Sequence, residues 1–322
     1  MNNKTLYFSS MLRSDNENLK LSAKLKKLIN EYGLPESAED LFTKLDDNEI
    51  PYAFIENTSD IWARDYMPVE INTGAYVSFR YDPSYLDKEP RKKTNYRKDI
   101  SSQLPLPEVD YSEIKDLCEE DYDKATYPPK VIYSDINLDG GNVEFSPSKN
   151  KVIISRRVYL ENPSRDKNEI VKELERLLKA EVIIIPSYDE KDEYDEYIDM
   201  TGHADGMVRF VDEDTVVGND NDYDNELEKE IIAVLNSHGI EVIDFPYLGA
   251  DGSDDSDEGS AVGLYMNFYK ADNCIILPEF GIEMDDLAEK RAEDIFKKPV
   301  VRTNINGIAE HGGVLNCISW ER

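Results

Sequence analysis

The chain has 322 residues, of which 40% are hydrophobic, so it can bury a sizeable core and is not expected to be disordered as a whole. It carries 68 acidic and 37 basic residues and a formal net charge of −31, and such a surface repels nucleic acid and anionic membranes. A cationic small molecule is compatible with this charge, although strong acidity also serves simply to keep a protein in solution.

The cysteine content points to a reducing compartment. Three cysteines, Cys118, Cys274 and Cys317, are too few and of the wrong parity for a disulfide framework. The first twenty residues lack a basic region followed by an apolar stretch, and no run approaches 18 apolar residues. We therefore expect a cytoplasmic protein that does not interact with a membrane.

Helical and extended patterns alternate from the start of the chain. The spacing of leucine and isoleucine predicts a helix over 17–32, which Gly33 ends, and a second helix that begins at Ser37 as its N-cap. The short apolar run at 52–55 then predicts a strand.

The order of helix followed by strand recurs three times downstream. The predicted pairs are a helix capped by Ser164 with strand 181–186, helix 225–238 with strand 241–246, and helix 284–296 with strand 300–305. This alternation indicates the α/β class, and a recurrence every ~60 residues suits a modular closed fold. No linker divides the chain, so we predict a single domain over 1–322, with acidic surface loops at 187–199 and 249–260.

Two polar segments each contain an aspartate close to residues that are typical of turns. In IWARDYMP, residues 61–68, Asp65 lies between aromatic residues and can be either a turn aspartate or a site carboxylate. In NLDGGNVEFSPS, residues 137–148, Asp139 precedes two glycines, which permit close approach of another backbone but also occur in ordinary turns. The residue types alone leave both readings open.

A third segment, TGHADGMVRF at 201–210, holds a histidine beside an acid. If it is a strand, His203, Asp205 and Met207 project on one face, which brings a base and a carboxylate together. The alternative is a buried, hydrogen-bonded histidine that Asp205 orients. Of the other two histidines, His238 is expected to interact with carbonyls at the end of its helix.

The fourth segment is EHGGVLNCISWER at the C-terminus. There Cys317 follows a glycine pair and precedes the polar Ser319, which are the partly open surroundings that a reactive thiolate needs. Cys118 and Cys274 are instead expected to be small buried hydrophobic residues. His311, in the same glycine-rich segment, can be a site residue or a solvated one.

In this order and spacing, the four segments resemble the guanidine-modifying superfamily, in particular the agmatine deiminase and bacterial peptidyl-arginine deiminase family. The shared pattern is W-x-R-D-x-x-P at 62–68, an acid before two glycines at 139–141, G-H-x-D at 202–205 and the late cysteine. LYMNFYKADNCIILPEFG at 264–281 is also similar to a family segment, and the match spans most of 50–322. LDGGNVEFSPS is similar to animal peptidyl-arginine deiminases as well.

The resemblance implies a five-bladed, pseudosymmetric α/β propeller (pentein) of ββαβ modules with the site at its axis. It implies that Asp65 and Asp205 bind a guanidinium group, whose planar fork matches carboxylates, and that Trp62 also contacts the substrate. The implied partner is a cationic guanidinium small molecule or an arginine-containing peptide.

The resemblance also implies the catalytic roles. Asp139 would orient His203, and Cys317 would attack the central carbon of the guanidinium. His203 would protonate the departing ammonia and then activate the water that hydrolyses the thiouronium intermediate. No metal and no organic cofactor is implied.

Departures from the family pattern concern the rest of the substrate. Asn316 precedes the nucleophile where many agmatine deiminases have histidine, and YVSFRYDPSYL at 76–86 replaces a segment rich in asparagine and tryptophan. These differences leave the choice between agmatine and peptidyl-arginine open. Arg80 is expected to form a surface ion pair rather than to bind a substrate carboxylate.

Two other functions are compatible with the sequence. An amidinotransferase would use the same cysteine, histidine and acids but pass the amidine to an amine. A non-catalytic relative would bind cations or peptides, and the acidic run at 250–259 raises calcium as a ligand, although the run lacks the order of EF-hand ligands. The sequence does not indicate an oligomeric state.

Overall fold

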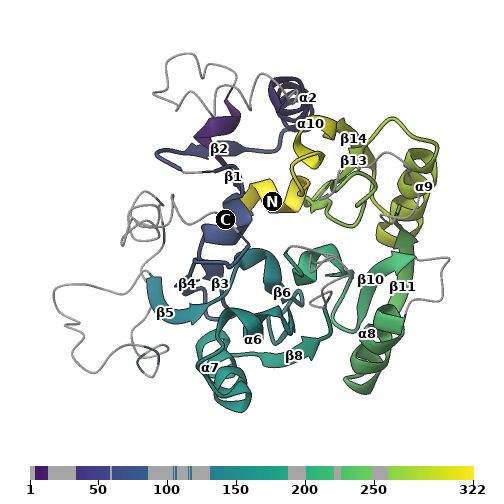
Figure 1. The fold of residues 1–322 in the computed structure, drawn as a ribbon. Coiled ribbons are helices and arrows are strands. Elements are labelled where there is room, and N and C mark those ends of the chain that lie inside the picture. Colours follow the sequence, from purple (N-terminus) through teal and green to yellow (C-terminus); the bar gives the residue numbers. More distant parts are fainter. Residues whose placement is uncertain are drawn as a thin grey trace.

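The computed structural model describes residues 4–13, 34–58, 60–85, 131–187, 201–220, 226–248 and 260–322, together with 104, 106, 115 and 117. Within these ranges the strands form five separate three-stranded sheets, which lie around a ring in Figure 1. In chain order the sheets are β1 (Leu6–Ser9) with β2 (Tyr52–Ile55) and β15 (Ser319–Glu321), β3 (Val69–Glu70) with β4 (Tyr76–Arg80) and β5 (Val131–Asn137), β6 (Glu144–Phe145) with β7 (Lys151–Ser155) and β8 (Glu181–Ile185), β9 (Val208–Phe210) with β10 (Thr215–Asp220) and β11 (Glu241–Pro246), and β12 (Tyr269–Lys270) with β13 (Ile275–Glu279) and β14 (Val300–Asn304).

All five sheets share one topology. The central strand pairs antiparallel with one neighbour and parallel with the other, and the parallel pair requires a crossover connection. Helices make four of these crossovers: α2 (Leu34–Asp47) lies between β1 and β2, α6 (Arg157–Glu161) and α7 (Lys167–Leu178) between β7 and β8, α8 (Glu226–Ser237) between β10 and β11, and α9 (Met284–Phe296) between β13 and β14, while most residues of the fifth crossover, between β4 and β5, lie outside the described ranges. The prediction of a five-bladed α/β propeller of ββαβ modules is therefore confirmed.

The two ends of the chain complete one sheet together. β15 pairs antiparallel with β1, with Leu6 opposite Glu321. Thr5 and Arg322 extend this pairing by two backbone hydrogen bonds, of 2.6 and 3.0 Å. The ring is thus closed by hydrogen bonds between the first and last strands, near the N and C labels in Figure 1.

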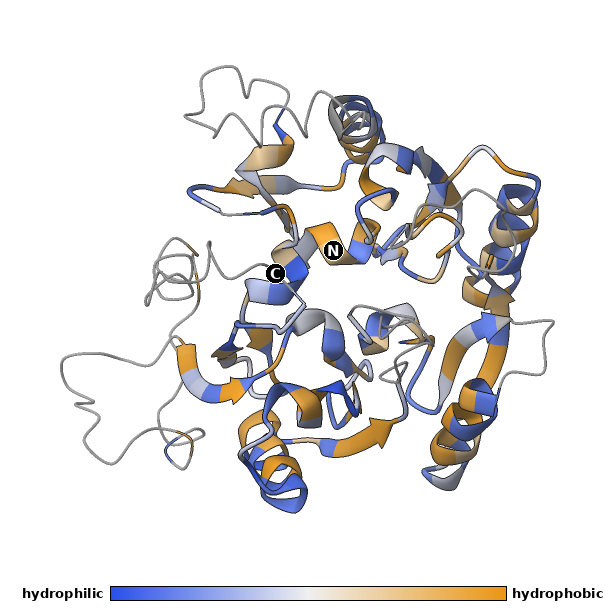
Figure 2. Ribbon diagram, in the orientation of Figure 1, coloured by the Kyte–Doolittle hydropathy of each residue, from blue (hydrophilic) through white to orange (hydrophobic). Residues whose placement is uncertain are grey.

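α7 illustrates why these segments become helices. Its buried residues are spaced on one face, at Ile170, Leu174, Leu177 and Leu178, and they pack in the same apolar cluster as residues of β7. Figure 2 shows hydrophobic residues along β8 and hydrophilic residues along the outer side of α7. No helix in the described ranges is long and apolar enough to cross a membrane.

Two predicted helices were correct in extent, a third was correct in its apolar face, and two predicted caps were wrong. The segments 225–238 and 284–296 form α8 and α9, and α7 follows its predicted apolar positions. However, Asp166 rather than Ser164 caps α7, because its carboxylate accepts the amide protons of Asn168 and Glu169. Ser37 lies inside α2, where its hydroxyl accepts a 3.0 Å hydrogen bond from the amide of Gly307.

Some expectations fall outside the described residues. The helix predicted over 17–32 and Cys118 lie there, as does almost all of the acidic segments 187–199 and 249–260.

Candidate active site

In each of the five modules, a short turn precedes the first strand of the antiparallel pair. The turns are α3 (Ala63–Tyr66) before β3, the 3-10 turn η4 (Gly140–Asn142) before β6, the 3-10 turn η5 (Ala204–Gly206) before β9, residues 265–268 before β12, and α11 (Leu315–Ile318) before β15. α3 contacts both η4 and α11, and η4 contacts η5. Residues that are far apart in the sequence therefore meet at one place.

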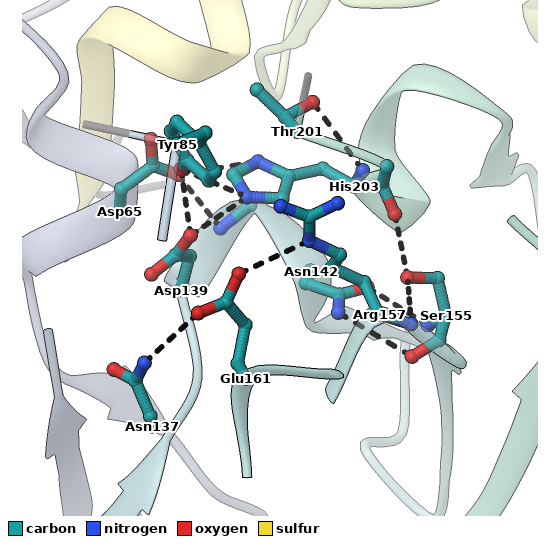
Figure 3. Close-up of polar contacts among 12 residues, drawn as sticks. Asp65, Tyr85, Asn137, Asp139, Asn142, Ser155, Arg157, Glu161, Thr201 and His203 are labelled. Atoms are coloured by element: carbon teal, nitrogen blue, oxygen red, sulfur yellow. Dashed lines mark hydrogen bonds and ion pairs between the residues drawn. The ribbon is translucent and has the colours of Figure 1, made fainter. Parts of the chain in front are cut away.

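His203 and Asp139 form a buried pair at the centre of this place (Figure 3). His203 Nε2 lies 2.9 Å from Asp139 Oδ2, and His203 Nδ1 lies 3.6 Å from Asp65 Oδ1. Burial alone would lower the pKa of His203, but the carboxylates of Asp65 and Asp139, with that of Asp205, outweigh burial and raise it. The geometry therefore favours an imidazolium that can donate a proton.

Asp65 lies on α3 with its carboxylate turned toward the pair. Its Oδ1 accepts a 3.1 Å hydrogen bond from the amide of Gly141, and its side chain is only 10% exposed. Burial raises the pKa of Asp65, as do the neighbouring acids, against the opposing effect of His203. This carboxyl group therefore ionises more readily when a cation lies beside it, whether the His203 imidazolium or a bound guanidinium.

Gly141 lies between the functional side chains. A Cβ atom at this position would come within 2.7 Å of Asp65 Oδ1, 2.7 Å of His203 Nδ1 and 3.4 Å of Asp205 Oδ1. Only glycine leaves room for the three side chains to converge here.

Asp205 reaches the site from η5 rather than from a strand. The condition that 201–210 is a strand is met only by β9, residues 208–210, because the amides of Gly206 and Met207 bond back to the carbonyls of His203 and Ala204 and close a 3-10 turn. The turn still brings His203 and Asp205 into one site. Asp205 Oδ2 accepts hydrogen bonds from Asn316 Nδ2, at 2.6 Å, and from Asn267 Nδ2, at 3.3 Å.

Cys317 lies on α11 with its Sγ atom 3.9 Å from Asp205 Oδ2. Asn267 Oδ1 fixes this turn, because it accepts the amide protons of Asn316, at 2.9 Å, and of Cys317, at 3.2 Å. Burial raises the pKa of Cys317 well above its ordinary value, and the carboxylates of Asp205 and Asp65 add to that effect. A cation bound between these carboxylates would offset their charge and favour the thiolate.

Trp62 is placed beside the nucleophile. A Cβ atom on Gly313 would overlap the Trp62 ring and approach Cys317 Cβ to 3.1 Å, so ring, glycine and cysteine are closely packed. All six side chains named from the sequence are thus brought together, namely Trp62, Asp65, Asp139, His203, Asp205 and Cys317.

Two residues of the site, Asn267 and Tyr85, were not assigned a role from the sequence, and Gly141 was expected only to permit close approach of another backbone. Asn267 lies in the segment 264–281, which was singled out because it is similar to a family segment. Tyr85 lies in the segment 76–86, which was singled out because it departs from the family pattern. Both segments were therefore noted in the sequence, but neither residue was identified as part of the site. Tyr85 donates a 2.7 Å hydrogen bond to Asp139 Oδ2.

Other sequence expectations concern residues away from the site. Arg80 is exposed and pairs with Asp82 at 2.6 Å, which confirms the surface ion pair. Cys274 is buried in the apolar core, as predicted. The prediction for His238 was wrong, because its side chain lies 2.8 Å from Glu181 Oε1 instead of interacting with the helix end. Over the described part of the chain, no group of three or more His, Cys, Asp or Glu side chains is arranged to hold a metal ion.

Curated relatives resemble the chain along much of its length. A Selenomonas ruminantium protein with the provisional name agmatine deiminase is 24% identical over 334 aligned positions, which cover 91% of this chain and 82% of that protein. A Streptococcus mutans protein with the same provisional name is 27% identical over 214 positions, which cover 58% of this chain and 57% of the relative. The chain thus spans a little over half the length of the second relative.

Solved structures resemble the fold. C. jejuni agmatine deiminase superposes with a TM-score of 0.67 over 99% of this chain and 93% of that chain, at 16% identity. A substrate-bound structure of that enzyme, in which a cysteine is replaced by serine, superposes with a TM-score of 0.64 over the same shares, also at 16% identity. The family model of the Porphyromonas-type peptidyl-arginine deiminases matches residues 23–322. Because this match covers nearly the whole chain, the protein belongs to the Porphyromonas-type peptidyl-arginine deiminase family.

Proposed function

We propose that this chain is a hydrolase that deiminates a guanidinium substrate, releasing ammonia and leaving a ureido product, within a single catalytic domain. The observation that carries the proposal is the arrangement around Gly141. Two carboxylates, Asp65 and Asp205, and the imidazole of His203 surround this glycine, and Cys317 Sγ lies 3.9 Å from Asp205.

The two carboxylates suit a planar cation. A guanidinium group presents pairs of N–H donors in one plane, and a carboxylate can accept two of them at once. Asp65 and Asp205 are mostly buried, so the attraction between each carboxylate and the cation is only weakly screened by solvent. The net charge of −31 also draws cations toward the protein.

The first half of the reaction forms a covalent intermediate. The Cys317 thiolate bonds to the central carbon of the guanidinium and gives a neutral tetrahedral adduct. His203 gives its proton to one nitrogen, the bond between carbon and that nitrogen breaks, and ammonia departs. The product of this half is a thiouronium group on Cys317.

The second half returns the enzyme to its starting state. His203, now neutral, accepts a proton from water as the water oxygen bonds to the thiouronium carbon. The bond between carbon and sulfur then breaks, which restores the Cys317 thiolate, and the hydroxyl proton of the former adduct passes to solvent, where the released ammonia takes it up, leaving the neutral ureido product. Asp139, 2.9 Å from His203 Nε2, stabilises the imidazolium in both halves.

We propose a small guanidinium compound as the substrate, with agmatine as the first compound to test. The support is that both relatives are named as agmatine deiminases and that the substrate-bound C. jejuni structure carries a cysteine-to-serine change. An arginine-containing peptide is the second candidate, because the family takes its name from peptidyl-arginine. The low cysteine content supports a cytoplasmic location.

The test is the release of ammonia and of a ureido product from agmatine, free arginine and an arginine-containing peptide, assayed in parallel. Cys317→Ala is expected to abolish turnover, and Cys274→Ala, a matched change at a buried cysteine away from the site, is expected to retain it. Transfer of the amidine to an added amine without hydrolysis would identify an amidinotransferase instead. Absence of product from all three compounds and from added amines would contradict the proposal.

A further inference from the structure

Tyr85 contacts the catalytic pair from a segment that the reaction scheme does not use. Its hydroxyl donates to Asp139 Oδ2 at 2.7 Å and lies 3.3 Å from His203 Nε2 (Figure 3). The Tyr85 and His203 rings are 5.9 Å apart at an angle of 70°. A single carboxylate oxygen of Asp139 is therefore shared between the imidazole and the phenol.

The phenol acts as a donor toward Asp139 in this arrangement. Burial raises the pKa of Tyr85 well above its ordinary value, and the carboxylates of Asp139 and Asp65 raise it further. Tyr85 therefore keeps its proton while His203 titrates. A second donor on Asp139 Oδ2 withdraws charge from that oxygen and weakens its hold on the imidazolium proton.

A buried ion pair holds the segment that carries Tyr85. Arg157 Nε lies 3.1 Å from Glu161 Oε1, and the two side chains are only 3% and 8% exposed. Glu161 accepts hydrogen bonds from the amide of Ser84, at 2.9 Å, and from its hydroxyl, at 2.7 Å, while Arg157 Nη2 donates to the same hydroxyl at 3.1 Å. The Arg157 guanidinium also lies 5.8 Å from the centre of the Tyr85 ring.

The free-energy cost of burying the Arg157–Glu161 ion pair indicates that the pair positions the neighbouring segment rather than stabilises the fold. Removing two charges from water opposes folding unless further hydrogen bonds compensate, so a buried ion pair is weak evidence of a stabilising role. Here the compensating bonds run to Ser84 and to Asn137, whose Nδ2 lies 3.2 Å from Glu161 Oε2. The pair therefore fixes the residue next to Tyr85 against α6.

We propose that Tyr85 is a positioning residue of the deiminase reaction, which orients Asp139 and limits the strength of its hydrogen bond to His203. The Arg157–Glu161 pair keeps Tyr85 in place. The kinetic part of this inference rests on the proposed function, whereas the hydrogen bonds are a property of the free protein. The consequence for the reaction is that His203 releases its proton to the departing ammonia more readily than it would beside an unshared Asp139 oxygen.

Several charged or titratable groups face His203, so the test must distinguish the effect of Tyr85 from the effects of the others. They are Asp65 on α3, Asp139 before η4, Asp205 on η5 and Tyr85 after β4, with Cys317 on α11 beside Asp205. Tyr85→Phe removes one hydroxyl and leaves every charged group in place. Tyr81→Phe is the matched control, because it removes a phenolic hydroxyl from the same segment and leaves the contacts of Tyr85 with Asp139 and His203 in place.

The direct measurement is the titration of His203 by NMR with 15N-labelled histidine. The chain has only three histidines, so His203 can be assigned with a His203→Asn sample, while His238 and His311 serve as internal references. Losing one hydrogen-bond donor on Asp139 is expected to raise the pKa of His203 by about 0.5 to 1 in Tyr85→Phe. Tyr81→Phe is expected to leave it unchanged.

Kinetics supply the second readout. Tyr85→Phe is expected to lower kcat by about 10-fold with little change in KM, because the effect lies in the proton transfer rather than in substrate binding. An unchanged or lowered pKa of His203 in Tyr85→Phe would overturn the proposal, even if activity fell. A raised pKa in a protein that deiminates none of the substrates would support the role of Tyr85 and contradict the proposed function instead.

Discussion

Gly140 and Gly141 are neighbours in the chain, yet a methyl group would have a different consequence at each. At Gly141 the added Cβ would meet the ends of two flexible side chains, with Asp65 Oδ1 and His203 Nδ1 each 2.7 Å away. At Gly140 it would overlap the backbone carbonyl oxygen of Arg64. At Gly206, close by in η5, it would meet no atom within 4 Å.

The size of the effect follows from how far each neighbour must move. Non-bonded atoms approach to about 3.5 Å, so in Gly141→Ala the carboxylate of Asp65, now 2.7 Å from the new Cβ, has to retreat by about 0.8 Å. A displacement of this size at a reacting centre costs about 100-fold in rate, or ~2.7 kcal/mol of transition-state stabilisation. Gly140→Ala instead strains the backbone, which costs about 1–3 kcal/mol of stability and lowers Tm by several degrees.

The assay compares the three alanine variants with the parent protein in two measurements, kcat/KM for ammonia release and Tm. We expect Gly141→Ala to lose activity with a Tm close to that of the parent, Gly140→Ala to lose stability, and Gly206→Ala to change neither. The reasoning is refuted if Gly141→Ala stays within about threefold of the parent in kcat/KM, or if Gly140→Ala and Gly141→Ala lower Tm equally.

Three further predictions follow from the electrostatics and hydrogen bonds of the site. Asp205→Asn should lower the pKa of Cys317 by removing a neighbouring negative charge, so alkylation by iodoacetamide at pH 8 should accelerate while turnover falls; slower alkylation would contradict this. Because the pKa of Asp65 is raised and a guanidinium binds its ionised form, kcat/KM should increase with pH as Asp65 deprotonates and decrease once His203 loses its proton; a profile that falls from pH 6 upward would exclude it. Asn267→Ala removes the acceptor of the Cys317 amide, while the Asn316 amide keeps its 3.1 Å bond to the backbone oxygen of residue 267, so the change should destabilise the protein by about 1–3 kcal/mol, seen as a lower Tm; an unchanged Tm would show that α11 does not depend on the Asn267 side chain.

The helices show what sequence patterns could and could not predict. The extent of α9 was predicted because its segment repeats the order of helix followed by strand, and Gly281 and Pro299 flank it. The start of α7 was misplaced because Ser164 and Asp166 are both good capping residues, and only the folded geometry decides which one reaches the free amides. For α2 the signal was Pro35 at the start of the helix, whereas Ser37 bonds to Gly307, 270 positions away.

The site was predicted by residue type, but its geometry was not. A strand over 201–210 would have placed His203 and Asp205 on one face, yet residues 204–206 form a 3-10 turn, at whose start the amide of Ala204 donates to Asn142 Oδ1 of the neighbouring module. Tyr85 and Asn267 contact partners 118 and 50 positions away, so no local pattern could assign their roles. Such contacts exist only once the modules are arranged around the ring.

The hydrogen bonds between Thr5 and Arg322 bear on how the chain could be rewired. Because these two residues are bonded side by side, a short peptide could join them without disturbing β1 or β15. New termini could then be placed in the turn between β6 and β7, where residues 147 and 148 are exposed. This cut would leave the chain uninterrupted within each of the other four modules. In such a circular permutant Cys317 would lie in the middle of the sequence, while its position in the folded site would stay the same. The order in which the site residues are synthesised would then change without a change in the site.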